Sequence, residues 1–149
     1  MVNELSPERA RQVLDMLTHG GAMDGINTSL ALRLIPLASE LGDDELVNRL
    51  LDHASDVAED DIERGWARFE GMKILKASAK NMLVLAESAE TMDLGNQLAA
   101  AVHHHVALLH MSNGALDEAR AIATRSLRLR EQLQDLNGMA YGLALLMAI

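Results

Sequence analysis

The stretch Gly114-Ala115-Leu116-Asp117-Glu118-Ala119-Arg120 decides the fold predicted for this 149-residue chain. It is a tight turn at a glycine, followed by a helix with an alanine five residues after that glycine. A similar turn begins 72 residues earlier, at Gly42, and Ser78 lies halfway between the two. Turns at a spacing of 36 residues predict a series of helix hairpins that repeat along the chain.

Small side chains recur at nearly the same spacing. Gly71 lies 36 residues before Ala107, and Gly142 lies 35 residues after it. Each falls midway along the expected first helix of a hairpin. We therefore expect a neighbouring helix to approach closely at these positions, since larger side chains would hold the two backbones apart.

Composition supports helices throughout. Hydrophobic residues make up 49% of the chain, but aromatic residues only 2%, so the apolar content is mainly Leu, Ala, Met, Val and Ile. No stretch alternates apolar and polar residues with the period of two that strands require. These observations predict an all-α fold with helices near residues 6–19, 27–41, 43–58, 61–79, 81–92, 95–112, 116–133 and 138–149.

Gly114, Ala119 and Ala107, in the segment from Gly95 to Leu133, give the chain a resemblance to the tetratricopeptide-repeat family. The resemblance implies a right-handed α-solenoid of antiparallel hairpins, with about three and a half repeats after an N-terminal helix. Other units depart from the pattern, because Ser78 replaces the turn glycine and Ile35 occupies the small site. A non-repeat helical bundle is the alternative. The expected single domain, 1–149, comprises a helix at 6–19, hairpins at 27–58, 61–92 and 95–133, and a half repeat at 138–149.

The same resemblance implies a function as a protein-interaction module that binds a peptide or helix of another protein in a concave groove. Arg68 and Lys76 would be two basic groove residues in an otherwise acidic chain, unless they only offset neighbouring acids on a solvated face. The groove carried over from the family comprises Arg68, Met72, Leu75, Lys76, His104, Leu108, Met111 and Ser112.

The segment from Leu136 onward contains no charged side chain. A helix that is apolar on all sides is normally buried on all sides. We therefore expect further sequence or a second copy of the chain to cover it, and a homodimer is the form predicted for this chain. The residues assigned to self-association are Tyr141, Leu145, Leu146, Met147 and Ile149.

The net charge of −9 argues against nucleic-acid binding, because an acidic surface repels phosphates. The chain has no cysteine, which excludes disulfides and thiolate chemistry. The uncharged run at 136–149 is shorter than the ~20 residues of a membrane span. With no signal-peptide pattern, the predicted location is cytoplasmic, with no membrane partner and no cofactor.

The histidines at 103, 104, 105 and 110 are the strongest candidates for chemistry. Helical metal ligands need a spacing of three or four residues, which no pair among these four has. The acids Glu59, Asp60, Asp61 and Glu63 are expected to cap a helix. We therefore predict no catalytic residue, no metal ligand and no enzymatic activity. The alternatives are a regulatory segment of a larger signalling or transcriptional regulator and, less favoured, a helical metal-dependent enzyme.

Overall fold

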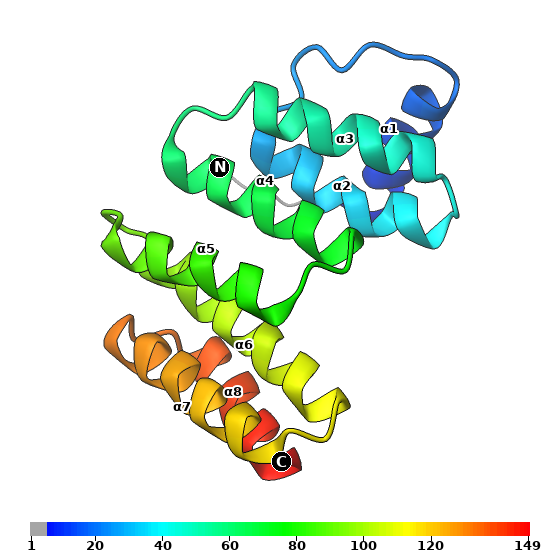
Figure 1. Cartoon of the computed structure of the whole chain (residues 1–149). Coiled ribbons are helices and arrows are strands. Elements are labelled where there is room, and N and C mark those ends of the chain that lie inside the picture. Colours follow the sequence, from blue (N-terminus) through cyan, green and yellow to red (C-terminus); the bar gives the residue numbers. More distant parts are fainter. Residues whose placement is uncertain (1–5) are drawn as a thin grey trace. The chain divides into compact units, whose positions relative to one another are not determined.

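The computed structural model describes residues 6–149, which form eight α-helices and no β-strand (Figure 1). The all-α prediction is confirmed for these residues. The helices are α1 (Pro7–Thr18), α2 (Thr28–Glu40), α3 (Asp44–Asp56), α4 (Asp61–Ile74), α5 (Ala79–Thr91), α6 (Asn96–Ser112), α7 (Leu116–Gln132) and α8 (Leu136–Ala148).

Local side chains define where most helices begin. A free N–H group in the first turn of a helix is satisfied when the residue before the helix offers a side-chain oxygen. Ser6, Asn27, Asp43, Ser78 and Asp135 do this for α1, α2, α3, α5 and α8.

The acidic cluster before α4 caps that helix, as predicted. Asp60 Oδ1 accepts a hydrogen bond from Glu63 N at 2.8 Å, and Glu63 Oε1 accepts one from Glu59 N at 3.0 Å. The two bonds resemble a capping box, except that the Glu63 carboxylate reaches the N–H of Glu59 rather than that of the capping residue Asp60.

The end of α4 corrects the predicted register. The expected helix ran to residue 79, but α4 ends at Ile74, and Lys76 adopts a left-handed conformation with φ 53°. Its N–H bonds the Lys73 carbonyl, and Ala77 N–H bonds the Met72 carbonyl. Gly114 makes the same pair of bonds after α6, with φ 78°. Lys76 is therefore the counterpart of the turn glycine, while Ser78 caps the next helix, and the turns are not evenly spaced by 36 residues.

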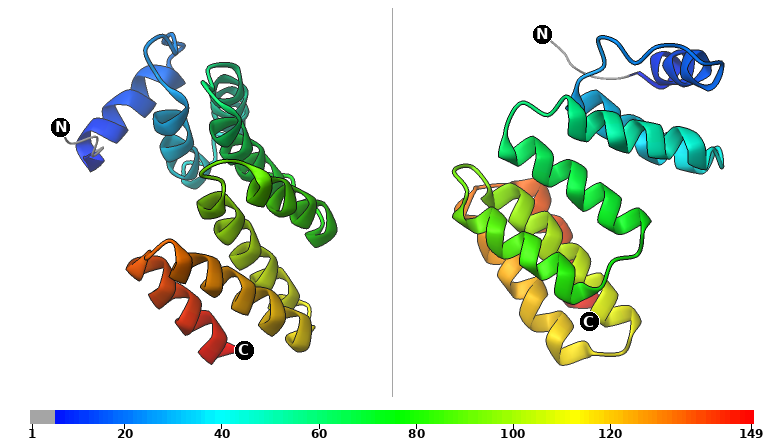
Figure 2. Two further views of the ribbon diagram at one scale, coloured as in Figure 1. Left: turned by 90° about the vertical axis from the view of Figure 1, so that its left-hand side faces the viewer. Right: turned by 45° about the horizontal axis from the view of Figure 1, so that its top comes forward.

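The described residues divide into two compact units at the junction of Glu70 and Gly71 within α4. In the first unit, α1 contacts α2, and α2 and α3 pack against each other as a hairpin. In the second unit, α5, α6, α7 and α8 pack in sequence, each helix against the next (Figure 2). The expected hairpin at 61–92 spans the junction, so its packing and the single domain 1–149 stay predictions.

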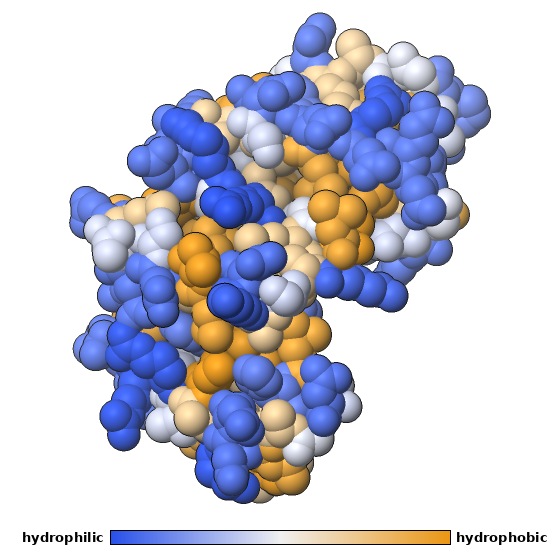
Figure 3. Space-filling model, in the orientation of Figure 1, coloured by the Kyte–Doolittle hydropathy of each residue, from blue (hydrophilic) through white to orange (hydrophobic). Residues whose placement is uncertain are grey.

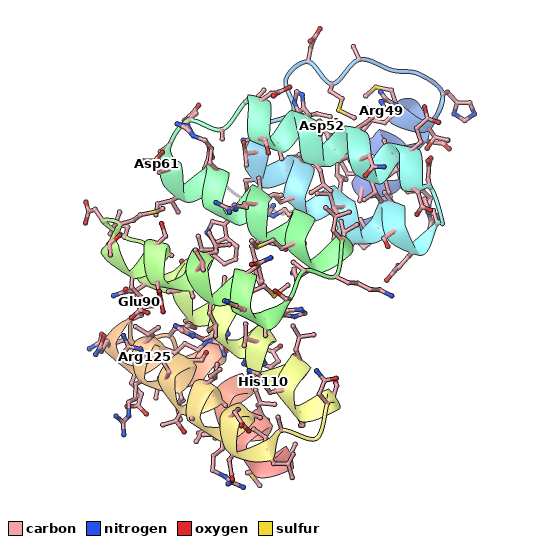
Figure 4. All side chains as sticks on the ribbon, viewed as in Figure 1. Arg49, Asp52, Asp61, Glu90, His110 and Arg125 are labelled. Carbon is pink, nitrogen blue, oxygen red and sulfur yellow. The ribbon has the colours of Figure 1, made fainter. Side chains whose placement is uncertain are left out.

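The core of the first unit is made by α1, α2 and α3, with Leu17, Leu34 and Leu50 fully buried at its centre. Arg49 of α3 fastens the end of α1 to this core. Its guanidinium donates to the carbonyls of Leu17 at 3.1 Å and Gly21 at 3.4 Å (Figure 4). The Leu17 carbonyl also accepts the Gly20 N–H at 3.1 Å, so Arg49 adds a second bond there and ties the loop after α1 to α3.

In the second unit, Ala107 of α6, Ala123 of α7 and Leu145 of α8 form a shared buried cluster. Gly142 of α8 lies close to Leu127, because a Cβ added there would sit 3.2 Å from Leu127 Cδ1. Two of the three predicted small-residue positions, Ala107 and Gly142, thus lie at close helix contacts. The third position, Gly71, lies at the junction of the units: a Cβ added there meets no atom within 4 Å, and the close contact expected there stays a prediction.

Candidate protein-interaction surface

The first four residues of the predicted groove lie at the end of α4 and just beyond it. Arg68 is exposed and belongs to the first unit, whereas Met72 is half-buried and belongs to the second. Leu75 and Lys76 lie in the turn after α4 rather than on a helix face, and the Leu75 side chain is 81% exposed. Whether Arg68 joins the others in one surface stays a prediction, since they lie in different units.

The remaining groove residues lie on α6, and the structure places three of them against neighbouring helices. Leu108 and Met111 are half-buried and pack against the cluster that α6, α7 and α8 share. His104 is also half-buried, and only Ser112 is exposed. In this unit α8 therefore contributes to covering the face of α6 that the resemblance assigned to an open groove.

His104 is part of a polar connection between α6, α7 and α8. Arg130 Nη1 lies 3.0 Å from His104 Nδ1 and donates to the Gly138 carbonyl at 3.1 Å. Burial lowers the pKa of His104, and the positive charges of Arg130 and His105 lower it further. A neutral His104 accepts the bond from Arg130, whereas a protonated His104 has no lone pair to offer. This group connects α7 to α6 and to the first turn of α8.

A second polar group, Glu90, joins α5, α6 and α7. Its carboxylate accepts hydrogen bonds from His103 Nε2 at 3.2 Å and from Arg125 Nη2, and Figure 4 shows Glu90 and Arg125 side by side. Burial alone would raise the pKa of Glu90, but the hydrogen bonds and positive charges of His103 and Arg125 lower it overall. His103 is buried, with its Nδ1 atom unpaired among residues 6–149. The histidine cluster thus supplies interhelical contacts.

Across residues 6–149, no group of three or more His, Cys, Asp or Glu side chains is placed to hold a metal ion. His103 bonds to Glu90 of α5, and His104 bonds to Arg130 of α7.

The most unusual surface belongs to α8. At 100° per residue, its side chains divide into two arcs: one faces the core, with Gly138, Gly142 and Leu145, and the other faces outward. We call the outward arc the α8 face. It has no charge, its polar groups are the amide of Asn137 and the hydroxyl of Tyr141, and Met147 is 88% exposed on it. The α8 face comprises Leu136, Asn137, Ala140, Tyr141, Leu143, Ala144, Met147 and Ala148.

The predicted self-association residues divide between the two arcs. Tyr141 and Met147 are exposed on the α8 face. Leu145 is only 6% exposed and lies in the core of its own unit, so it does not belong to the α8 face. Leu146 and Ile149 are half-buried against the same core. The α8 face also includes Leu136 and Leu143, which the prediction did not contain, because an uncharged helix has no polar side to show which residues face outward.

Charge is distributed unequally between the units. Residues 6–70 contain six Lys and Arg against fourteen Asp and Glu, whereas residues 71–149 contain seven against seven. The net negative charge therefore lies in the first unit, and the second is balanced. In Figure 3, hydrophobic residues reach the visible surface among hydrophilic ones. A balanced unit with an apolar face can meet another protein without strong repulsion.

Comparison of the chain with models of protein families, with curated proteins and with solved structures finds no match. The resemblance to tetratricopeptide repeats thus rests on the residues of this chain. None of the helices in residues 6–149 combines the length and apolar character needed to cross a membrane.

Proposed function

We propose that this chain is a cytoplasmic protein-interaction module of the helical-repeat type, built as a right-handed stack similar to tetratricopeptide repeats. The observation that carries the proposal is the exposed α8 face. Leu136, Leu143 and Met147 lie on it beside small alanines, with no charge among them. Large contiguous apolar patches on a protein surface commonly mark sites of association.

The proposed partner at the α8 face is a second copy of the chain. A two-fold symmetric contact brings the same face of both copies together, so every apolar residue meets an apolar counterpart. The second unit is balanced in charge, and the α8 face adds no like charges to the contact. Ala140 and Ala144 allow the two helices to approach closely along the centre of the face.

A partner peptide remains proposed for the exposed part of the predicted groove. In the second unit Leu75, Lys76 and Ser112 are exposed, and a peptide carrying a carboxylate group would suit the basic side chain of Lys76. The half-buried residues His104, Leu108 and Met111 instead support the packing of α8, because they contact α7 or the core that α8 shares. The proposal involves no catalysis, cofactor, nucleic acid or membrane.

Sedimentation equilibrium tests the dimer with charge-introducing variants. The wild-type chain is expected at twice 16.2 kDa, and the double variant Leu143→Glu, Met147→Glu at one chain. Leu94→Glu is the matched control, because Leu94 is 84% exposed in the same unit but lies outside α8. A wild-type monomer at tens of micromolar would contradict the proposal, as would a control that dissociates the dimer equally well.

A further inference from the structure

The first unit contains a groove that is separate from the α8 face of the second unit. It runs along α1 and reaches the C-terminal end of α2, with a volume of about 440 Å³. Its lining on α1 extends from Pro7 to Thr18, which at 1.5 Å per residue is about 16 Å. That length corresponds to three turns of helix. The groove therefore has the dimensions to hold a short helical segment rather than a single side chain.

The floor of the groove is apolar. Ala10 and Leu14 of α1 are buried at its base, and Leu37 of α2 is half-buried beside them. Leu41, just after α2, also lines the groove, yet its side chain is 68% exposed. An exposed leucine at the edge of an apolar groove is a contact that a bound apolar side chain would bury.

The rim carries charges that no other described residue pairs with. Asp15 of α1 and Glu40 of α2 supply two carboxylates, and Arg11 supplies one guanidinium. No ion pair within residues 6–149 involves any of the three. The groove thus has a net negative rim, and it lies in the unit with fourteen acidic residues against six basic ones.

We infer that this groove docks a basic amphipathic helix of another protein. The apolar floor selects leucine-like side chains at helical spacing, and the rim acids select lysine or arginine beside them. Arg11 can form an ion pair with one acidic residue of the partner, which would fix whether the bound helix runs parallel or antiparallel to α1. A second copy of this chain does not suit the groove, because its first unit is acidic and its α8 face carries no lysine or arginine to meet the rim acids. Anionic membranes and nucleic acids are disfavoured because the unit that holds the groove is itself acidic.

The inference adds a second surface to the proposed interaction module and is independent of the α8 face. The groove and the α8 face lie in different units, so a substitution in one surface changes no residue of the other. A monomeric chain that binds the helix would support the groove alone. A dimer without helix binding would support the α8 face alone.

Fluorescence anisotropy with a labelled synthetic helix tests the groove. The probe has fourteen residues, with leucine at positions i, i+4, i+7 and i+11 and lysine on both flanks. A scrambled peptide of the same composition is the peptide control. Saturable binding of the amphipathic probe, weakened by raising NaCl from 50 to 500 mM, is expected, because exposed charge pairs are screened by salt.

Three variants locate the binding. Asp15→Asn with Glu40→Gln should weaken the probe by about tenfold, the combined effect of two exposed charge pairs. Asp52→Asn with Asp56→Asn removes the same charge from exposed sites of the same unit outside the groove lining, and should weaken it less than about twofold. Leu41→Gln should weaken it by about fivefold through lost apolar contact. Circular dichroism confirms that each variant stays helical.

Several results would overturn the inference. Equal weakening by the two double variants would mean that only general charge attraction binds the probe. Equal binding of the scrambled peptide, or an unchanged affinity for Leu41→Gln, would exclude an apolar groove contact. Binding that emerges only after deletion of residues 1–5 would make the chain itself the occupant.

Discussion

Arg130→Met removes the connection between α6, α7 and α8 and is expected to destabilise the second unit. Arg130 donates to His104 Nδ1 at 3.0 Å and to the Gly138 carbonyl at 3.1 Å. A hydrogen bond from a charged donor contributes about 1.5–3 kcal/mol when buried. Because Arg130 is only half-buried, we take the lower part of that range and expect a total loss of about 2–3 kcal/mol in the free energy of unfolding.

The same substitution changes the pH dependence of stability. His104 has a pKa below its ordinary value of 6.5 when folded, so the folded chain binds fewer protons there than the unfolded chain. Its contribution is therefore complete above pH 6.5 and is lost as the pH falls below that value, by at most about 1.4 kcal/mol per pH unit. Without the charge of Arg130 the pKa rises toward 6.5, and the slope becomes shallower but persists, because burial remains.

Urea unfolding followed by circular dichroism at 222 nm, at pH 7.5 and at pH 5.5, measures both effects. Arg128→Met is the matched control: it removes the same charge from α7, but Arg128 is exposed and has no partner among residues 6–149. The reasoning is refuted if the two variants lose the same free energy at pH 7.5, or if Arg130→Met leaves the pH slope unchanged.

Two further substitutions separate close contacts from open positions. Gly142→Leu should lose about 1–3 kcal/mol in thermal or urea unfolding, because the added side chain meets Leu127, whereas Gly71→Ala should gain up to about 1 kcal/mol by helix propensity alone. A loss at Gly71 equal to that at Gly142 would restore the original repeat register. Ser78→Ala should cost about 1 kcal/mol, since Ser78 Oγ accepts the Asn81 N–H at 3.2 Å. An unchanged midpoint would show that this cap contributes nothing to α5.

Much of the local structure could be predicted because its causes are local. The caps at Ser6, the acidic start of α4 and the glycine turns at Gly42 and Gly114 depend on residues within one turn of each other. The same holds for the absence of strands among the described residues, since the chain has no alternating segment. Short-range chemistry of this kind is readable from sequence.

The predicted repeat register failed where the signal was unusual. Lys76 takes the left-handed conformation at the end of α4, and lysine is not a residue whose presence indicates that conformation. The sequence prediction therefore placed the turn at Ser78, two positions later. In the structure Ser78 is instead the N-cap of α5.

The sequence indicates that the segment from Leu136 onward is an uncharged helix, but it does not show which of its residues face outward. An uncharged helix has no polar side to indicate which residues face outward. The orientation of α8 instead depends on Gly142 approaching Leu127 of α7, a contact between distant residues. A contact between distant residues also explains why His104 and Leu108 were predicted to line an open groove. The sequence does not show that α6 shares its core with α8.

A single introduced cysteine tests the central proposal, self-association through the α8 face, most directly. The chain has no cysteine of its own, so Ala144→Cys places one thiol at the middle of that face. In a two-fold symmetric contact the two thiols lie near the axis, and oxidation should join two chains into a disulfide-linked species at twice 16.2 kDa on a non-reducing gel. Leu94→Cys, exposed in the same unit outside α8, should remain at 16.2 kDa. A monomeric Ala144→Cys chain, or equal cross-linking of both variants, would contradict the account.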